Sequence, residues 1–567
     1  MLVPFFVQQH SAPPSGQTAS VAETDGSKSP SGAKKSLLSV KRPTTKISGA
    51  GDGSLTPVAD VRAKWNGQTK TAPPPPTDIR DIFQTSSKQP NSGSRIDALV
   101  FAKLRENNIL PANLCSDGVF VRRVYLDVIG TLPTAEEAKA FLKDPDPKRR
   151  EALIDRLLER PEFADYWAMR WSDILRVKSE FPINLWPNAA RAYHHWIKTA
   201  LAENMPYDRF ARTLLTSSGS NFRHPPVNFY RAMQKKDPPT TARTVALTFM
   251  GVRPEELPAE RWAEMEVFFS QLGYKATREW KEEIVYFDER KTLRSSDAVF
   301  PDGTPAKIPP GQDPRIAFAD WLVSPKNPWF AQNIANRAWA WLLGRGIIHE
   351  ADDARTDNPP SNPELLAYLQ DELRAAKYDL KSLYRLILNS KTYQFSCIPA
   401  SDHPDAAKLF AYYPVRRLDA EVLIDAICQI SGTTEQYSSP IPEPFTYLPN
   451  GYRAISLPDA SISSPFLEMF GRPSRDTGLE SERSNVFTAG QRLHLLNSAH
   501  IEKKIQKGPV LAAILKSSKR PREIVEDLYL AILSRYPTTD ELAESEIPSL
   551  SDIAWALINS EEFLCRH

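Results

Sequence analysis

A loop rich in carboxylates is the first part of this sequence that could do chemistry. In GIIHEADDARTDNPPSNPELL, an imidazole and several carboxylates lie close together, at His349, Glu350, Asp352, Asp353 and Asp357. Calcium and magnesium prefer such oxygen ligands, but the spacing matches no EF-hand loop. The alternative is a polar loop that leads into a helix with Ser361 as N-cap and Glu364 as its capping partner. We predict no metal site here and keep the three aspartates as candidate binding residues.

The segment RPSRDTGLESERS is a second candidate, because it is dense in arginine and carboxylate. Its candidate binding residues are Arg472, Arg475, Glu482 and Arg483. A guanidinium group can hold a carboxylate or a sulfate through two parallel hydrogen bonds. The same charges could equally form a buried ion-pair network that fixes the loop. If this Arg-rich segment (472–483) and the acidic loop (349–357) meet around one cleft, a hydrolase or a carbohydrate-binding site is favoured.

The other reactive residue types form no complete catalytic or metal-binding set. His194 and His195 are neighbours in a predicted helix, where adjacent side chains point about 100° apart and cannot ligate one metal from the same face. The cysteines lie singly, without metal-site or redox spacing. They are Cys115, Cys397, Cys428 and Cys565. The residues therefore predict no cofactor and no metal.

One helical phrase recurs along the chain and shows how it folds. LIDRLLERPEF ends at Phe163, LYRLILNSKTY at Tyr393 and IAWALINSEEF at Phe563. In each copy, apolar residues at i, i+4 and i+5 form one stripe of an α-helix. These stripes are Leu153, Leu157 and Leu158, then Leu383, Ile387 and Leu388, then Ile553, Leu557 and Ile558. Each copy predicts a helix that buries one face.

Helix starts and one strand signal complete the local prediction. Thr134 with Glu137, and Thr538 with Glu541, follow the capping-box pattern, in which each side chain bonds the other residue's backbone N–H. The run IVYF within WKEEIVYFDER has high β-propensity. A short strand or hairpin is therefore predicted between the helical parts.

Long irregular segments separate the predicted helices. The chain holds 49 prolines and only 23 glycines, which is typical of stiff connections rather than flexible linkers. Residues 251–312 and 436–480 show little helical pattern, and the second segment is rich in proline. Loops of this length inside a helical protein are uncommon and often functional. The segment 436–480 is therefore the best structural indication of a working surface.

The overall composition is that of a soluble globular protein. Hydrophobic residues make up 41% of the chain and charged residues 25%, which is ordinary for this class. The length of 567 residues favours two or more domains. The net charge of +2 gives no general attraction to nucleic acid. No apolar run approaches the roughly 20 residues that span a bilayer. The first residues, MLVPFFV, lack the basic region of a complete signal peptide.

The predicted fold is mainly α, with two packed helical domains, long Pro-rich loops and one small β-hairpin. Residues 1–94 form a basic tail rich in Ser, Pro and Lys, which cannot bury enough apolar surface to offset its ordering entropy and is predicted to be disordered. The first helical domain covers 95–290, a linker covers 291–312, and the second helical domain covers 313–567.

Several phrases together resemble a known pair of bacterial domains. RIDALVFAKL, RRVYLDVIGTLPTAEEAKAFL and LIDRLLERPEFADYWAMRWSDILR resemble domain of unknown function 1549. RIAFADWLVSPKNPWFAQNIANRAWAWLLGRGI, LKSLYRLILNSKTYQ, RRLDAEVLIDAI, ESERS and ALINSEEFL resemble its usual partner, domain of unknown function 1553. The resemblance covers nearly everything from about residue 95 onward and points to the planctomycete-type paired proteins. It implies an exported protein of the periplasm or cell envelope.

The chain departs from that resemblance at one place. The resemblance implies that many relatives carry a Cys-x-x-Cys-His pattern after an apolar run that corresponds to Ala246 to Val252 here. Such a cluster could hold haem or a metal. Here the matching stretch runs from Arg253 to Leu257 and contains neither thiolate nor imidazole. No cytochrome-like segment is visible before residue 95. A redox role implied by the relatives is therefore not expected for this chain.

The first functional hypothesis is a structural or interaction protein of the cell envelope without a complete catalytic set. Its expected partner is an envelope protein or a polysaccharide. The alternative is a hydrolase or a carbohydrate-binding protein that uses the acidic loop and the Arg-rich segment.

Overall fold

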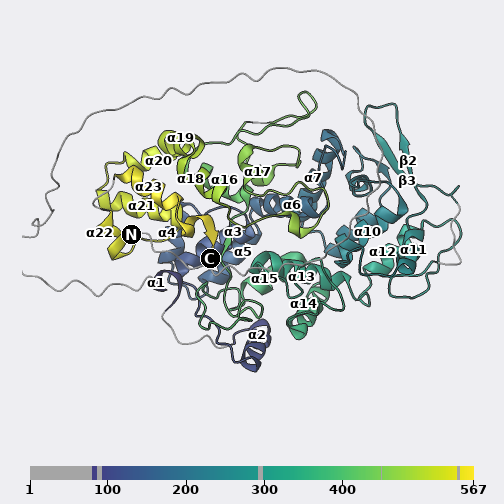
Figure 1. Ribbon diagram of the computed structural model, residues 1–567, viewed down its shortest axis with the longest axis horizontal. Coiled ribbons are helices and arrows are strands. Elements are labelled where there is room, and N and C mark those ends of the chain that lie inside the picture. The colour runs from purple at the N-terminus through teal and green to yellow at the C-terminus, as the bar shows by residue number, and fades with distance from the viewer. Residues whose placement is uncertain (1–79, 86–91, 292–297, 449, 546–548) are drawn as a thin grey trace, which may run out of the picture. The chain divides into compact units, whose positions relative to one another are not determined.

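The computed structural model describes residues 80–85, 92–291, 298–448, 450–545 and 549–567 (Figure 1). The described residues belong to one compact unit. Most of the tail at 1–94, predicted to be disordered, lies outside the described residues. Within it, the structure describes the short helix α1 (Arg80–Phe83) and the residues just before α2.

The described part of the chain is mainly helical, as the sequence predicts. The longer helices of its first half are α2 (Arg95–Glu106), α3 (Asp117–Val128), α4 (Ala135–Lys143), α5 (Arg149–Leu158), α6 (Pro161–Ile174), α7 (Pro187–Ala202), α8 (Tyr207–Thr216), α10 (Pro238–Met250) and α11 (Ala259–Val267). Those of its second half are α12 (Pro314–Leu322), α13 (Phe330–Leu343), α14 (Pro363–Ala375), α15 (Leu380–Leu388), α16 (Ala420–Ser431), α18 (Ala489–Asn497), α19 (Ala499–Lys507), α21 (Pro521–Leu533) and α23 (Leu550–Ile558). Shorter helical elements include α9 (Asn228–Arg231), α17 (Pro465–Met469), α20 (Pro509–Leu515), α22 (Thr539–Glu544), α24 (Glu561–Leu564) and the 3-10 turns η1 (Pro225–Val227), η3 (Ala454–Ser456) and η4 (Glu480–Glu482).

The recurring phrase forms a helix in all three copies. It corresponds to α5, α15 and α23, and every apolar residue of the predicted stripes is buried. Each helix presents one apolar face to the core, as the spacing of the stripe requires.

Both predicted capping boxes are present. The Thr134 side chain accepts a hydrogen bond from the backbone N–H of Glu137, and the Glu137 carboxylate accepts one from the backbone N–H of Thr134. Thr538 and Glu541 make the same reciprocal pair at the start of α22. These bonds satisfy backbone donors that the first turn of a helix leaves free.

Replacing Thr134 with Ala should lower the free energy of unfolding by about 1 kcal/mol, because α4 then loses an N-cap acceptor. The matched control is Thr134→Ser, which keeps the hydroxyl and should stay close to the unmodified protein. Urea unfolding followed by tryptophan fluorescence measures both. Equal losses for the Ala and Ser variants would show that the cap bond contributes nothing.

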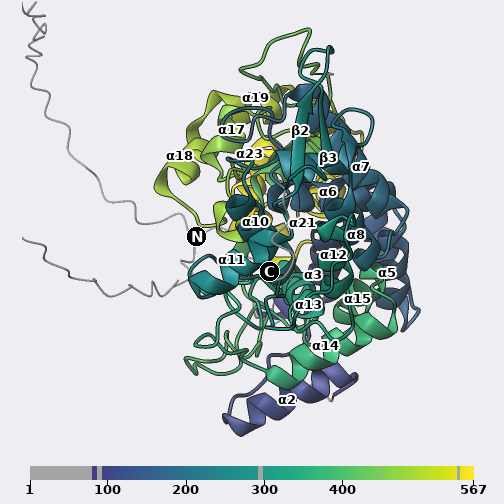
Figure 2. The same cartoon turned by 90° about the vertical axis from the view of Figure 1, so that its right-hand side faces the viewer.

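Helices from the two halves of the chain pack on each other. The contacts include α4 with α21, α5 with α15, and α10 with α13. In Figure 1 the yellow C-terminal helix α21 lies beside the blue helix α4, and in Figure 2 helix α2 runs along α14. The buried apolar side chains form one continuous cluster across both halves. The domain boundaries at 290 and 313 stay a prediction.

Strands make up two small antiparallel sheets. Strand β2 (Leu272–Ala276) pairs with β3 (Glu283–Phe287) as the predicted hairpin, and β1 (Gly219–Ser220) adds to the other edge of β3. In the second sheet, β4 (Arg416–Arg417) pairs with β5 (Cys565–Arg566). This pairing brings the last residues of the chain against the start of α16.

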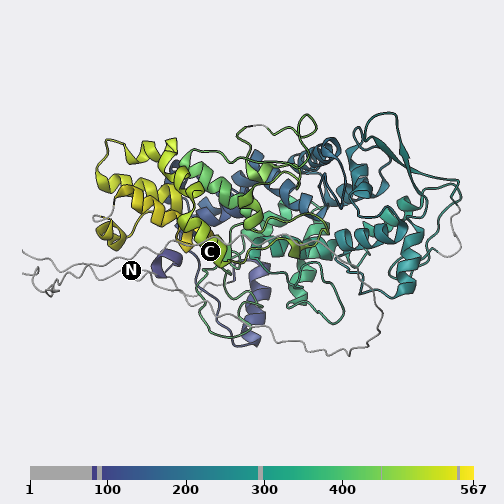
Figure 3. The same cartoon turned by 45° about the horizontal axis from the view of Figure 1, so that its top comes forward.

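The Pro-rich segment follows α16 and has little regular structure. Helix α16 ends at Gly432, whose φ of 74° is left-handed and therefore suits glycine. Apart from its short helices and 3-10 turns, the segment continues as a loop to α18, and Figure 3 shows it in green. No helix in the described ranges is both long enough and apolar enough to cross a membrane.

Candidate functional site

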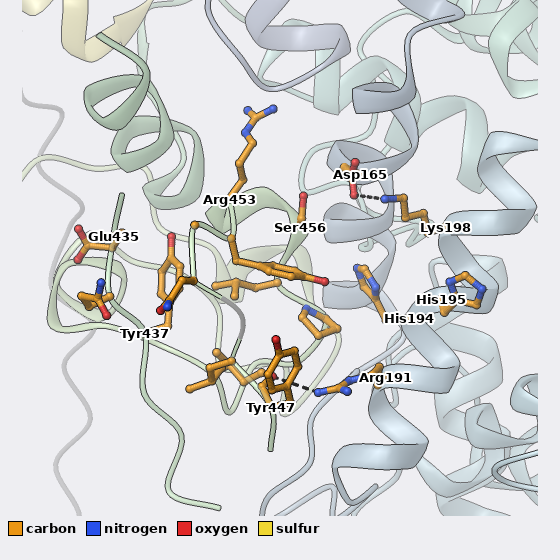
Figure 4. Close-up of a pocket in the computed structure, with 18 residues that line it drawn as sticks. Asp165, Arg191, His194, His195, Lys198, Glu435, Tyr437, Tyr447, Arg453 and Ser456 are labelled. Atoms are coloured by element: carbon orange, nitrogen blue, oxygen red, sulfur yellow. Dashed lines mark hydrogen bonds and ion pairs between the residues drawn. The ribbon is translucent and has the colours of Figure 1, made fainter. Parts of the chain in front are cut away.

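A cavity of about 690 Å³ lies between helix α7 and the Pro-rich segment (Figure 4). We call it the α7 cavity. Side chains of α7 form one wall, and the other is formed by residues 435–437, 447–448, 450–453, 456–458 and 462. The charged and aromatic residues of its walls include Arg191, His194, Lys198, Glu435, Tyr437, Tyr447, Tyr452 and Arg453.

Helix α7 presents a polar face to this cavity because of its residue spacing. Arg191, His194, His195 and Lys198 follow one another at helical intervals and line the same wall, while Tyr193 is buried among other side chains of the core. The Lys198 ammonium pairs with Asp165 of α6 at 2.5 Å. The Arg191 guanidinium donates a hydrogen bond to the Tyr447 carbonyl oxygen at 3.1 Å, which joins the two walls.

His194 is a buried, neutral imidazole in the wall. Burial lowers its pKa to about 3, and the neighbouring cations Arg475 and Lys198 add to this effect. Its Nε2 atom is buried and has no hydrogen-bond partner among the described residues. A ligand hydroxyl in the cavity could satisfy this nitrogen, because neutral imidazole can donate or accept at that atom.

The opposite wall carries three tyrosines and a carboxylate. Tyr437, Tyr447 and Tyr452 come from the irregular segment, and the buried Tyr437 hydroxyl has no hydrogen-bond partner in the described residues. Burial acts to raise the pKa of Glu435, but His500 at 2.9 Å and Lys504 at 3.0 Å outweigh it and lower that pKa. Glu435 is therefore held as a carboxylate.

An aromatic cluster lies beside this cavity. We define the aromatic platform as Trp186, Trp280 and Phe445, in which the Trp186 ring contacts each of the other two rings edge to face. The Trp280 side chain is 67% exposed and Phe445 is 44% exposed, although both are large and apolar. Tyr447, two residues after Phe445, is 58% exposed and lines the α7 cavity.

The backbone under the platform is strained. Trp186 has φ 74° and ψ 146°, a backbone conformation that residues other than glycine rarely adopt. The Lys281 ammonium lies 5.0 Å from the Trp186 ring centroid and 5.2 Å from that of Trp280, within the range of a cation–π interaction. Such strain commonly accompanies functional surfaces, where it holds a side chain in a required position.

The predicted arginines of the Arg-rich segment are buried and paired. Arg475 contacts Asp173 at 2.8 Å, and Arg483 contacts Asp173 and Glu421, each at 2.7 Å. Arg472 lies 3.4 Å from Glu421. The structure thus places these three guanidinium groups in an ion-pair network that fixes the loop, which was one of the two alternatives. Their side chains are at most 5% exposed.

Glu482 serves the same segment differently. Its carboxylate accepts hydrogen bonds from the backbone N–H groups of Asp476 and Thr477, at 3.2 and 2.6 Å. It therefore closes the turn that carries Arg475 and Arg483.

The acidic loop is also built mainly from internal pairs. Asp352 is fully buried and pairs with Arg253 at 2.8 Å. Arg253 begins the stretch that stands in place of the Cys-x-x-Cys-His pattern, so this ion pair joins that stretch to the acidic loop. Asp353 pairs with Arg355 at 2.9 Å, and Asp357 is largely exposed. The N-cap of α14 is Asn362 rather than the predicted Ser361, because the Asn362 side chain reaches the Leu365 N–H.

The two predicted segments do touch each other, but not at the α7 cavity. The Glu480 backbone N–H donates to the Asp352 carboxylate at 3.1 Å. A second cavity is lined by residues of both segments, His349 and Glu350 from one and Glu480 and Arg483 from the other. A binding role for the predicted site residues stays a prediction.

Sequence reasoning missed the aromatic residues of the α7 cavity and the platform. It indicated the Pro-rich segment as a working surface, and described residues of that segment do form one wall of the cavity. It treated tryptophan chiefly as core. The available signal was aromatic residues inside proline-rich or turn sequence, as in Phe445 and Tyr447, where no helical stripe explains them.

Within the described ranges, no group of three or more His, Cys, Asp or Glu side chains is placed to hold a metal ion. No curated protein and no solved structure matched the chain significantly.

Two family models match. Residues 95–264 match the family described as PSCyt2, Protein of unknown function (DUF1549). Residues 314–546 match the family described as PSD1, Protein of unknown function (DUF1553). The chain therefore belongs to the proteins that carry DUF1549 followed by DUF1553.

Proposed function

We propose that the protein is an exported binding protein of the cell envelope and that its ligand is a polysaccharide chain. Export and an envelope location are implied by the resemblance to planctomycete-type paired proteins. The saccharide ligand is supported by the α7 cavity and the aromatic platform. The observation that carries the proposal is a group of exposed aromatic rings next to the cavity. Trp280 and Phe445 both contact the half-buried Trp186, and Tyr447, two residues after Phe445, lines the cavity.

The chemistry of the cavity suits a sugar ring. Pyranose rings combine apolar C–H faces with a rim of hydroxyl groups, so they need aromatic faces together with hydrogen-bond donors and acceptors. Tyr437, Tyr447 and Tyr452 supply rings, while Arg191 and His194 supply polar atoms. The volume of about 690 Å³ lies within the range usual for small-molecule sites.

The platform extends this surface beyond the cavity. A ligand the size of one or two sugars would fit within the cavity and leave Trp280 exposed to water. A longer chain would cover the platform as well and remove that apolar surface from water. The expected ligand is therefore a polymer rather than a monosaccharide.

The charged groups of the cavity favour binding over cleavage. Glycoside hydrolysis requires a carboxylic acid that carries a proton at the working pH and a second, ionised carboxylate. The two carboxylates of this cavity, Asp165 and Glu435, are each engaged by a cation. The lowered pKa of Glu435 keeps it ionised.

Trp280→Ala and Tyr447→Ala should each weaken polysaccharide binding by about tenfold, because each removes a stacking surface. The full chain is titrated by isothermal calorimetry with laminarin, xylan and alginate, which are a neutral β-glucan, a pentose polymer and a uronate polymer. We expect at least one of them to bind.

Trp555→Ala is the matched control, because Trp555 is a half-exposed tryptophan of α23 that lines neither cavity. It should bind like the unmodified protein. The proposal fails if the unmodified protein binds none of the polymers, or if the control loses as much affinity as the platform variants.

A further inference from the structure

The second cavity lies where the acidic loop and the Arg-rich segment meet, and it has a basic wall. Its volume is about 280 Å³. Four arginines from separate parts of the chain line it, namely Arg170 of α6, Arg345 after α13, Arg416 of β4 and Arg483. It shares no lining residue with the α7 cavity, so a ligand of the second cavity is independent of the proposed polysaccharide.

Positive charge exceeds negative charge in the ion-pair network behind this wall. Each guanidinium group in the network lies within ion-pair distance of at least one of four carboxylates, those of Asp127, Asp173, Asp419 and Glu421. The guanidinium groups are those of Arg170, Arg416, Arg472, Arg475, Arg483 and Arg566. Six cations thus share four anions, although the side chains are almost completely buried. Buried charge without a partner is costly, so an added anion would stabilise this arrangement.

Two of the arginines that line the cavity carry a donor nitrogen without a partner among the described residues. Arg170 is only 6% exposed, and its Nε has no hydrogen-bond partner among the described residues. The Nε of Arg416 is also buried and has no hydrogen-bond partner among the described residues. No hydrogen bond or ion pair joins the Arg345 guanidinium to another described residue, and burial lowers its pKa.

The carboxylates of the wall do not cancel this excess. Glu350 and Asp352 share the Arg253 guanidinium, at 2.7 and 2.8 Å, so this cation balances only one of the two carboxylates. Glu480 accepts a hydrogen bond from the Trp341 indole N–H at 2.6 Å, and burial raises the pKa of Glu480. Even when the charges of Glu480, Glu350 and Asp352 are all counted, the guanidinium groups of the wall, the network and Arg253 outnumber these carboxylates and those of the network by one.

We propose that this cavity binds a small oxyanion, which Arg345 holds together with Arg170 and Arg416. Guanidinium groups match the oxygens of carboxylate, phosphate and sulfate through charge-assisted hydrogen bonds. The cavity volume lies just below the range for drug-sized ligands, which fits one anionic group or a small organic acid. The anion would balance the excess charge of the network and would lock the acidic loop against the Arg-rich segment.

The test uses the full chain in a chloride buffer free of phosphate, sulfate and carboxylates. Phosphate, sulfate and malonate are titrated separately by isothermal calorimetry, so the arms distinguish inorganic anions from an organic dicarboxylate. We expect at least one to bind, and to raise the melting temperature. Arg345→Gln should weaken that binding by at least about tenfold, because it removes a charge-assisted contact. Arg345→Lys keeps the charge but loses the planar fork and should weaken it less.

Arg105→Gln is the matched control, since Arg105 is an exposed arginine of α2 that lines neither cavity. It makes the same change of charge and should bind like the unmodified protein. Absence of binding in all three arms overturns the proposal. Equal affinity in Arg345→Gln and the unmodified protein overturns it too, because the anion would then bind elsewhere.

Discussion

Replacing Asp419 with Asn should lower the free energy of unfolding by about 3–5 kcal/mol, the usual loss when one partner of a buried ion pair is removed. Asp419 is completely buried and lies 3.1 Å from Arg170 and 3.0 Å from Arg566. Burial acts to raise its pKa, but these arginines and Arg483 outweigh burial and hold that pKa well below its usual range. The substitution leaves their charges buried with less compensation. Urea unfolding followed by tryptophan fluorescence measures the loss.

The matched control for this prediction is Asp155→Asn. Asp155 pairs with Arg385 at 2.5 Å, but both side chains are substantially exposed. Solvent screens such a pair, so the control should lose less than about 1 kcal/mol. A comparable loss at both positions would mean that burial of the network does not determine its contribution to stability.

His194→Gln should make the stability of the protein less dependent on pH in the acid range. In the folded protein burial lowers the pKa of His194 to about 3, whereas an unfolded chain has a histidine pKa of about 6.5. Between these values the unfolded state binds a proton that the folded state does not bind. Stability is therefore lost as the pH falls through this window, by about 1.4 kcal/mol per pH unit from this residue. Glutamine has no such proton site.

The measurement is the urea midpoint of the unmodified protein and the variant at pH 7.5, 6.0 and 5.0. The informative quantity is the slope with pH, because lost packing would shift every midpoint of the variant together. His195→Gln is the control, since His195 is exposed on the same helix and should leave the slope unchanged. Parallel slopes for His194→Gln and the unmodified protein would contradict a neutral buried His194.

Asp425 has the opposite effect on the pH dependence of stability, because burial raises its pKa to about 6. It is present in every variant, so it does not affect the comparison between them.

The two proposed ligand surfaces use the polar groups of the molecule differently. The α7 cavity combines aromatic rings with carboxylates that already have cationic partners. The second cavity combines unpartnered guanidinium nitrogens with an excess of buried positive charge. A polysaccharide that binds at the first and a small anion that binds at the second would be independent events, and the variants at Trp280 and Arg345 separate them.

The sequence by itself determined the recurring helices, two capping boxes, the hairpin and the order of the two families, but it placed the N-cap of α14 at Ser361 instead of Asn362. These features depend on local spacing. The stripe at Leu153, Leu157 and Leu158 and the pair Thr134 and Glu137 act within one or two turns of helix, so periodicity and side-chain type are sufficient.

Only the tertiary structure decided what the charged and aromatic residues do. Arg475 meets Asp173, which is 302 residues away in the sequence, and no local pattern indicates that pairing. The sequence therefore left open whether the arginines bind a ligand or fix the loop. The aromatic platform likewise joins Trp186, Trp280 and Phe445 from three separate segments. Such contacts depend on the path of irregular backbone, which carries no periodic signal, and on which buried charges find partners when the halves of the chain pack together.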